Sequence, residues 1–227
     1  MNDARPSANY TPAIFDVRDV DEARRIILTA EAGTTTDERW AKETPWLAER
    51  ILDRFPLTDR HVVIDFGCGL GRMAKVLIER TRCWVVGVDM SQGMRQLAPG
   101  YVQSAKFAAV SPPMLDLMIA RGFRAELAIA IWVLQHVAQP DADVRRLQRV
   151  LVPDGGVFVA NNLRRAVPTD RGWAHDGVDI EGLLARSFVP AWRGTLPQEI
   201  GGDVLPHASF MAAYRNPGAA AMAPTQV

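Results

Sequence analysis

Short, continuous apolar runs recur between residues 61 and 161, separated by segments in which apolar residues have helical spacing. Strands with one face in water usually alternate apolar and polar residues, whereas strands covered on both faces are apolar throughout. The pattern therefore predicts an α/β fold, a parallel sheet with helices on both faces. Strands are expected at 61–66, 83–89, 105–110, 126–132 and 156–161, and helices at 71–80, 92–98, 113–120 and 141–151, the last capped by Asp141.

The segments on either side of this region follow other patterns. Residues 1–18 are polar and are expected to be loose, and helices are expected within 19–30 and 37–55. The second helix should break or kink at Pro45, because proline lacks a backbone N–H. Residues 162–216 predict one helix and two further strands, paired as a hairpin at one sheet edge. We expect a helical lead-in or cap over 1–58, a core over 59–216 and a disordered tail over 217–227.

Composition narrows the class of partner. The 227 residues are 48% hydrophobic, and 26 basic side chains balance 26 acidic ones. Nucleic-acid surfaces usually carry a basic excess, so we expect no nucleic-acid partner. The N-terminus lacks an apolar signal-like stretch and no run is long enough to cross a bilayer, so we expect a cytoplasmic protein without membrane contact. Cys68 and Cys83 should lie at opposite sheet edges, too far apart for a disulfide, and we expect no metal site.

The stretch VVIDFGCGLGRMA, residues 62–74, places Gly67, Gly69 and Gly71 directly after a predicted strand. A turn of this kind lets a ligand approach the backbone closely. A P-loop would need Lys-Ser or Lys-Thr after the glycines, and a dinucleotide fingerprint would need glycine where Arg72 stands. Asp65 precedes the loop, and a carboxylate is a poor neighbour for a pyrophosphate. A positively charged ligand fits this stretch better.

The segment resembles the first motif of the class I S-adenosylmethionine (SAM)-dependent methyltransferases, a hydrophobic strand, an acid and then G-x-G-x-G. Three further segments resemble later motifs of that family, in the expected order: WVVGVDMS (84–91), AELAIAIWVLQHV (125–137) and LVPDGGVFV (151–159). The resemblance covers residues 62–160. It implies a Rossmann-like, doubly wound, mostly parallel sheet of seven strands, the last antiparallel, and SAM as the cofactor, with S-adenosylhomocysteine (SAH) as the product.

The resemblance also implies roles for particular residues. Asp65 and Gly67 would hold the methionine moiety, Asp89 would bind the ribose hydroxyls, and Ile131 would offer a carbonyl near the ammonium. Many members carry an acid after the third strand to bind the adenine amino group, but here the stretch is KFAAVSPP and Ala109 or Val110 stands in that place. The full set of cofactor-binding residues expected is Asp65, Gly67, Cys68, Gly69, Asp89, Met90 (on the adenine face), Ala109 and Ile131.

The acceptor side is less constrained by the sequence. His136 is the candidate general base, although a histidine here could instead support the loop. Trp40 and Glu43 could close the pocket or simply pack, and Arg72 could tie down the glycine loop. The interpretation is a SAM-dependent methyltransferase acting on a small molecule through an O, N or C nucleophile. The alternatives are a SAM- or SAH-binding protein without transfer activity and, less favoured because of Arg72, a nucleotide-linked oxidoreductase.

Overall fold

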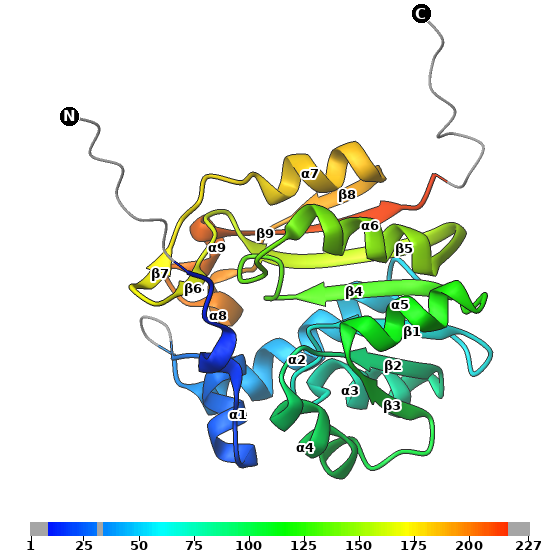
Figure 1. Cartoon of the computed structure of the whole chain (residues 1–227), viewed down its shortest axis with the longest axis horizontal. Coiled ribbons are helices and arrows are strands. Elements are labelled where there is room, and N and C mark those ends of the chain that lie inside the picture. The colour runs from blue at the N-terminus through cyan, green and yellow to red at the C-terminus, as the bar shows by residue number, and fades with distance from the viewer. Residues whose placement is uncertain (1–8, 31–33, 218–227) are drawn as a thin grey trace, which may run out of the picture.

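The computed structural model describes residues 9–30 and 34–217, which form a seven-stranded sheet with helices on both faces (Figure 1). The strand order is β3-β2-β1-β4-β5-β9-β8. The first five strands in chain order are parallel, and β9 is antiparallel to both of its neighbours. The strands are β1 (Val62–Phe66), β2 (Trp84–Val88), β3 (Phe107–Val110), β4 (Ala125–Ile131), β5 (Leu151–Asn162), β8 (Val189–Gly194) and β9 (Ser209–Arg215). The predicted sheet is confirmed.

The two faces of the sheet bury different residues of the same strands. Val63 packs toward α2 (Thr36–Leu52) and α3 (Arg72–Thr81), while the adjacent Ile64 packs toward α5 (Pro112–Ala120), α6 (Pro140–Val150) and α7 (Ile180–Ser187). This follows from the two-residue repeat of a strand. Each strand therefore needs apolar residues at every position, which is the continuous pattern seen in the sequence.

The structure corrects three expectations about helices: the break at Pro45, the length of the helix expected at 92–98, and the cap of the helix expected at 141–151. α2 runs through Pro45 without a break, because a capping box between Thr35 and Glu38 fixes its start and Leu47 and Ile51 are fully buried against the sheet. α4 (Gln92–Val102) likewise continues past Pro99 and is longer than expected. At the start of α6, Gln139 rather than Asp141 occupies the cap position, with Pro140 as the first helical residue.

Residues 9–18 have a defined structure, which contradicts the expectation that they are loose. Tyr10 forms a bridge with Thr169, and the backbone N–H of Thr11 donates to the Pro168 carbonyl at 3.0 Å. A short 3₁₀ helix, η1 (Pro12–Phe15), and α1 (Val20–Ile27) follow. The segment thus lies against the hairpin of β6 (Val167–Thr169) and β7 (Gly172–Ala174). Residues 1–8 and 218–227, including most of the expected tail, lie outside the described residues.

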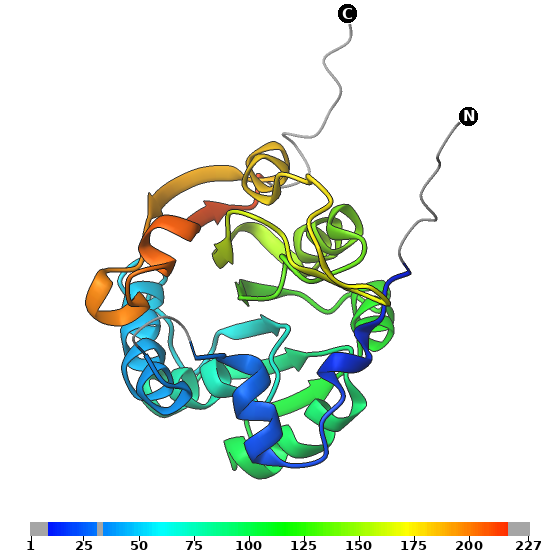
Figure 2. The same cartoon turned by 90° about the vertical axis from the view of Figure 1, so that its left-hand side faces the viewer.

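The β6–β7 hairpin and the N-terminal segment lie at the carboxyl ends of the parallel strands, on the side toward which the β4 arrow points in Figure 1. Figure 2 views the molecule from that side. Two helices of four residues each, α8 (Gln198–Gly201) and α9 (Leu205–Ala208), precede β9. Within residues 9–30 and 34–217, no helix combines the length and apolar character needed to cross a bilayer.

Candidate active site

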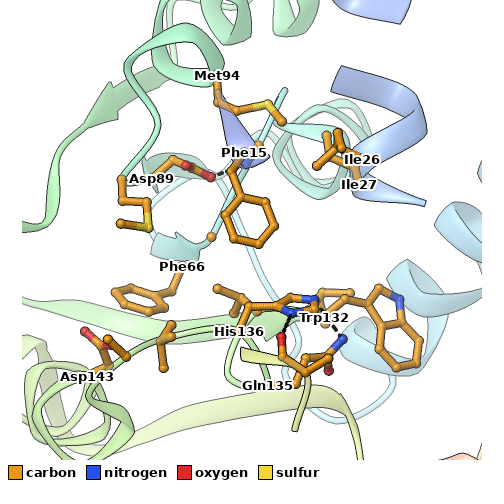
Figure 3. A pocket seen from close by; sticks show the side chains of 18 of the residues that line it. Phe15, Ile26, Ile27, Phe66, Asp89, Met94, Trp132, Gln135, His136 and Asp143 are labelled. Carbon is orange, nitrogen blue, oxygen red and sulfur yellow. Dashed lines mark hydrogen bonds between the residues drawn. The ribbon is translucent and has the colours of Figure 1, made fainter. Parts of the chain in front are cut away.

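A cavity of about 600 Å³ lies at the carboxyl ends of β1, β2 and β4 (Figure 3). The chain proceeds from β1 outward to β2 and β3, then returns to β4 on the other side of β1, so the cavity lies where the strand order reverses. Open α/β sheets bind ligands at such a switch point. Of the residues expected from the sequence, Gly67, Gly69, Asp89, Met90, Ile131 and His136 line the cavity.

The glycine loop follows β1 and depends on glycine for backbone and packing reasons. Gly67 has φ of +72°, and a Cβ there would lie 2.3 Å from the Cγ2 atom of Val133. Gly69 has φ of +51°, and its Cβ would lie 2.6 Å from the Cδ1 atom of Ile27. Left-handed φ values favour glycine. Close packing by neighbouring side chains therefore requires these glycines, and the backbone they expose faces the cavity.

Asp89 follows β2, and two backbone donors hold its carboxylate. The N–H groups of Gly69 and Ser91 donate to its two oxygens at 2.8 and 2.9 Å. Burial raises the pKa of Asp89, and these donors oppose that rise. Met90 follows Asp89 in the chain and is 46% exposed. The Tyr10 hydroxyl donates a hydrogen bond to the Met90 sulfur at 3.3 Å. An acid and an apolar side chain thus lie together at one end of the cavity.

Asp65 lies behind the glycine loop rather than in the cavity wall. It is 3% exposed, and its Oδ2 atom has no hydrogen-bond partner within the described chain. Burial raises the pKa of Asp65 to about 7, although the Arg72 guanidinium acts in the opposite direction. Leaving a carboxylate oxygen unpartnered in the interior is costly, and the raised pKa favours the protonated, neutral form of this group.

The structure does not bring Cys68 or Ala109 into the cavity wall. Cys68 is buried, and its sulfur lies 2.8 Å from where a Cβ on Gly87 would be, so it packs toward β2. Ala109 is paired with Gly87 on the outer strand β3. The sequence lacks the acid that many family members carry after the third strand, and in the structure the end of β3 presents no acid to the cavity.

A buried ionic network joins α2 to the glycine loop and to the segment after β4. The Glu43 carboxylate accepts from Arg39 (2.7 and 3.2 Å), from Arg72 (3.1 Å) and from the Trp132 indole (2.8 Å). Arg39 and Arg72 are at most 5% exposed, and Trp132 is half-buried. Glu43 and Arg72 therefore have packing roles, and Trp40 does not line the cavity.

His136 also lines the cavity, and its partners define its protonation. Its Nδ1 atom lies 2.6 Å from the Ala166 carbonyl, which only accepts, so Nδ1 carries the proton. Gln135 accepts from the Asn162 N–H through Oε1 at 2.8 Å, so its amide nitrogen is the group that donates to His136 Nε2 at 3.2 Å. Burial lowers the pKa of His136, and the imidazole is therefore neutral at pH 7.

The aromatic wall of the cavity, Phe15, His136 and Trp173, comes from three distant segments. The His136 ring centroid lies 5.5 Å from that of Phe15 and 5.3 Å from that of Trp173. Sequence reasoning missed Phe15 and Trp173, because both lie in segments without periodicity. It also missed Arg39, which lines the cavity and pairs with Glu43 four residues later, a spacing that the sequence does show.

A mostly parallel sheet with a glycine loop after β1 and an acid after β2 defines the Rossmann-like class of ligand-binding α/β proteins. Residues 38–213 match the family described as a methyltransferase domain, and the chain belongs to that family.

Curated relatives match about half of the chain. It is 27% identical over 128 residues to the methyltransferase GfsG of Streptomyces halstedii (55% of this chain, 46% of the relative). It is 31% identical over 135 residues to trans-aconitate 2-methyltransferase of Delftia acidovorans (59% of this chain, 50% of the relative). The chain spans about half the length of the curated relatives it matches.

Solved structures share the fold at low identity. Magnesium protoporphyrin IX methyltransferase of Synechocystis, with bound SAH, gives a TM-score of 0.63 at 17% identity (89% of this chain, 96% of that one). The N-methyltransferase NodS of Bradyrhizobium japonicum, in complex with SAH, gives 0.59 at 15% identity (78% and 88%). The cyclase SpnF gives 0.60 at 17% identity (76% and 80%), so the fold alone does not fix the reaction.

Proposed function

We propose that this protein is a SAM-dependent methyltransferase acting on a small-molecule acceptor. The observation that carries the proposal is one cavity at the switch point that contains the glycine loop, Asp89 and Met90 at one side and an aromatic wall at the other. Family membership supports methyl transfer. The balanced charge of the chain, 26 basic and 26 acidic side chains, supports a small acceptor over a nucleic acid.

The hydrogen-bond acceptors at and behind the cavity wall fit a positively charged nucleoside such as SAM. The unpartnered Oδ2 of Asp65 needs a donor, and an ammonium group would supply one. Asp89 would accept from ribose hydroxyls, Met90 would pack on the adenine, and the carbonyl of Ile131 would face the ammonium. Gly67 and Gly69 line the cavity, where their backbones would lie against the ligand.

When bound, SAM supplies a methyl group already activated by its sulfonium. The protein's part is then to orient the acceptor and exclude water. Phe15 and Trp173 line the proposed acceptor side of the cavity, and His136 is the candidate base for an acceptor that must lose a proton. Its Nε2 is the unprotonated nitrogen, and to take a proton it must exchange the Gln135 amide for the acceptor.

Calorimetry with SAH and with NAD tests the cofactor. The protein should bind SAH and not NAD, Asp89→Ala should abolish SAH binding, and the exposed control Asp59→Ala should leave it unchanged. Tight NAD binding would instead indicate an oxidoreductase.

A methyl-transfer screen of phenols, amines and carboxylates, read by mass spectrometry, tests the reaction. We expect a methylated product that depends on SAM. SAH binding with no product from any class would leave the binding-only alternative, and the proposed transfer would be wrong.

The compartment is a separate proposal. Cys68 and Cys83 are both buried and free. Unpaired cysteines are typical of a reducing compartment, which supports a cytoplasmic location.

A further inference from the structure

The end of the cavity beside Met90 lacks the groups expected to recognise a purine edge. β3 ends at Val110 without an acid, and the next cavity residue is Pro112, the first residue of α5. Pro112 and Pro113 have no backbone N–H to donate. The Ser111 hydroxyl accepts from the Met114 N–H at the start of α5, and Ser111 does not line the cavity.

Asp143 supplies a carboxylate at this end from another element. It lies in the first turn of α6 and lines the same cavity as Met90 and Pro112. In Figure 3 it lies beside Phe66, at the opposite end from Trp132. Tyr10 connects the two sides, because its hydroxyl contacts the Met90 sulfur and the negative charge of Asp143 adds to the rise that burial causes in its pKa.

Asp143 retains acceptor capacity after its protein contacts are counted. Arg146 donates to one of its oxygens, while the same guanidinium forms a two-point pair with Asp116 at 2.9 Å for each bond. Two carboxylates therefore share one arginine. Within the described residues, the hydrogen bond from Arg146 goes to Oδ1, and the Oδ2 atom of Asp143 accepts none. Burial raises the pKa of Asp143, and the nearby Arg146 cation opposes that rise.

We propose that Asp143 recognises the cofactor's adenine by accepting a hydrogen bond from its exocyclic amino group, in place of the missing acid after β3. The proposal rests on the SAM binding proposed above. It makes Asp143 a specificity-determining residue that favours an amino group over a carbonyl at this position of the purine. Asp141, two residues earlier on the same helix, is exposed and does not line the cavity.

The test compares SAH with S-inosylhomocysteine, in which a carbonyl replaces the amino group, by calorimetry on the full chain. The wild type should prefer SAH by about 10- to 100-fold, since a hydrogen bond to a charged group is lost and an oxygen faces a carboxylate. Asp143→Asn is isosteric and its amide can both donate and accept, so the preference should fall to within about threefold. Asp141→Asn should keep the wild-type preference.

The outcomes separate this inference from the proposed function. If the wild type binds both ligands equally, or Asp143→Asn keeps the full preference, Asp143 does not recognise the amino group and the inference is wrong while SAM binding stands. If the wild type binds neither ligand, SAM binding itself fails and the inference fails with it. The comparison of the two ligands on the wild type does not depend on whether a variant folds.

Discussion

Replacing Glu43 with glutamine tests whether the buried network holds the cavity walls together. Glu43 is fully buried and accepts four hydrogen bonds from Arg39, Arg72 and Trp132. Glutamine has nearly the same shape, but only its oxygen accepts, and its amide nitrogen would face a guanidinium. Arg39 would then lose its carboxylate partner, and Arg72 would keep only the nearby Asp65, to which it makes no hydrogen bond.

The expected loss of stability is large. Removing one partner of a buried ion pair costs about 3–5 kcal/mol, because the remaining charge is left uncompensated. With a urea dependence of about 3 kcal/mol per M, the unfolding midpoint should fall by about 1–2 M. The exposed pair of Glu181 and Arg193 is the matched control, and Glu181→Gln should cost less than about 1 kcal/mol.

Urea unfolding followed by circular dichroism, with SAH calorimetry on the folded variant, measures both effects. Adding Arg72→Met to Glu43→Gln should recover part of the lost stability, because it removes a buried guanidinium that has lost its Glu43 partner. A Glu43→Gln midpoint no lower than that of Glu181→Gln would refute the reasoning, since the buried charges would then be compensated by something other than Glu43.

Three further predictions concern the cavity and the buried Asp65 behind its glycine loop. Asp65 has a folded pKa of about 7, so its carboxyl is protonated below that pH. Because an ammonium ligand needs the charged carboxylate, the affinity for SAH should fall as the pH drops from 7 to 5.5. The Asp65→Asn variant should show no such pH dependence. Gly67→Ala should weaken SAH binding and unfold more readily than Gly122→Ala, which has φ of +90° but open space around its Cβ. His136→Gln should lower kcat by about 10²- to 10⁴-fold if the imidazole is the base; a fall in melting temperature with unchanged kcat would show that it only supports the loop.

The sheet could be predicted because its cause is local in the sequence. Strands buried on both faces need apolar residues at every position, and Ile64 and Val63 show the two faces being filled by adjacent residues. Helix lengths were predicted less well. Proline discourages a helix locally, but the burial of Leu47 and Ile51 on α2 offsets the lost hydrogen bond at Pro45.

The candidate site was predictable where one motif carries it and not where distant segments meet. Asp89 and Met90 follow a strand whose end is evident in the sequence, and both line the cavity. Asp143 is indistinguishable in the sequence from an ordinary acid in the first turn of a helix. Its place in the cavity depends on how α6 packs beside α5, which the sequence pattern does not encode.

The aromatic wall, which is the proposed acceptor side, is held by contacts between described residues that lie far apart in the sequence. Asn9 donates to the Asp170 carboxylate through its backbone and side chain, both at 3.1 Å, which fastens the segment carrying Phe15 to the hairpin carrying Trp173. The family match begins at residue 38, so the first of these two segments lies outside it. The glycine loop and Asp89 lie within the matched residues, whereas the aromatic wall combines Phe15, which the match does not include, with His136 and Trp173, which it does. The acceptors named for the relatives therefore carry little weight here, and we expect the shape of the wall around Phe15 and Trp173 to be the better guide to the acceptor proposed above.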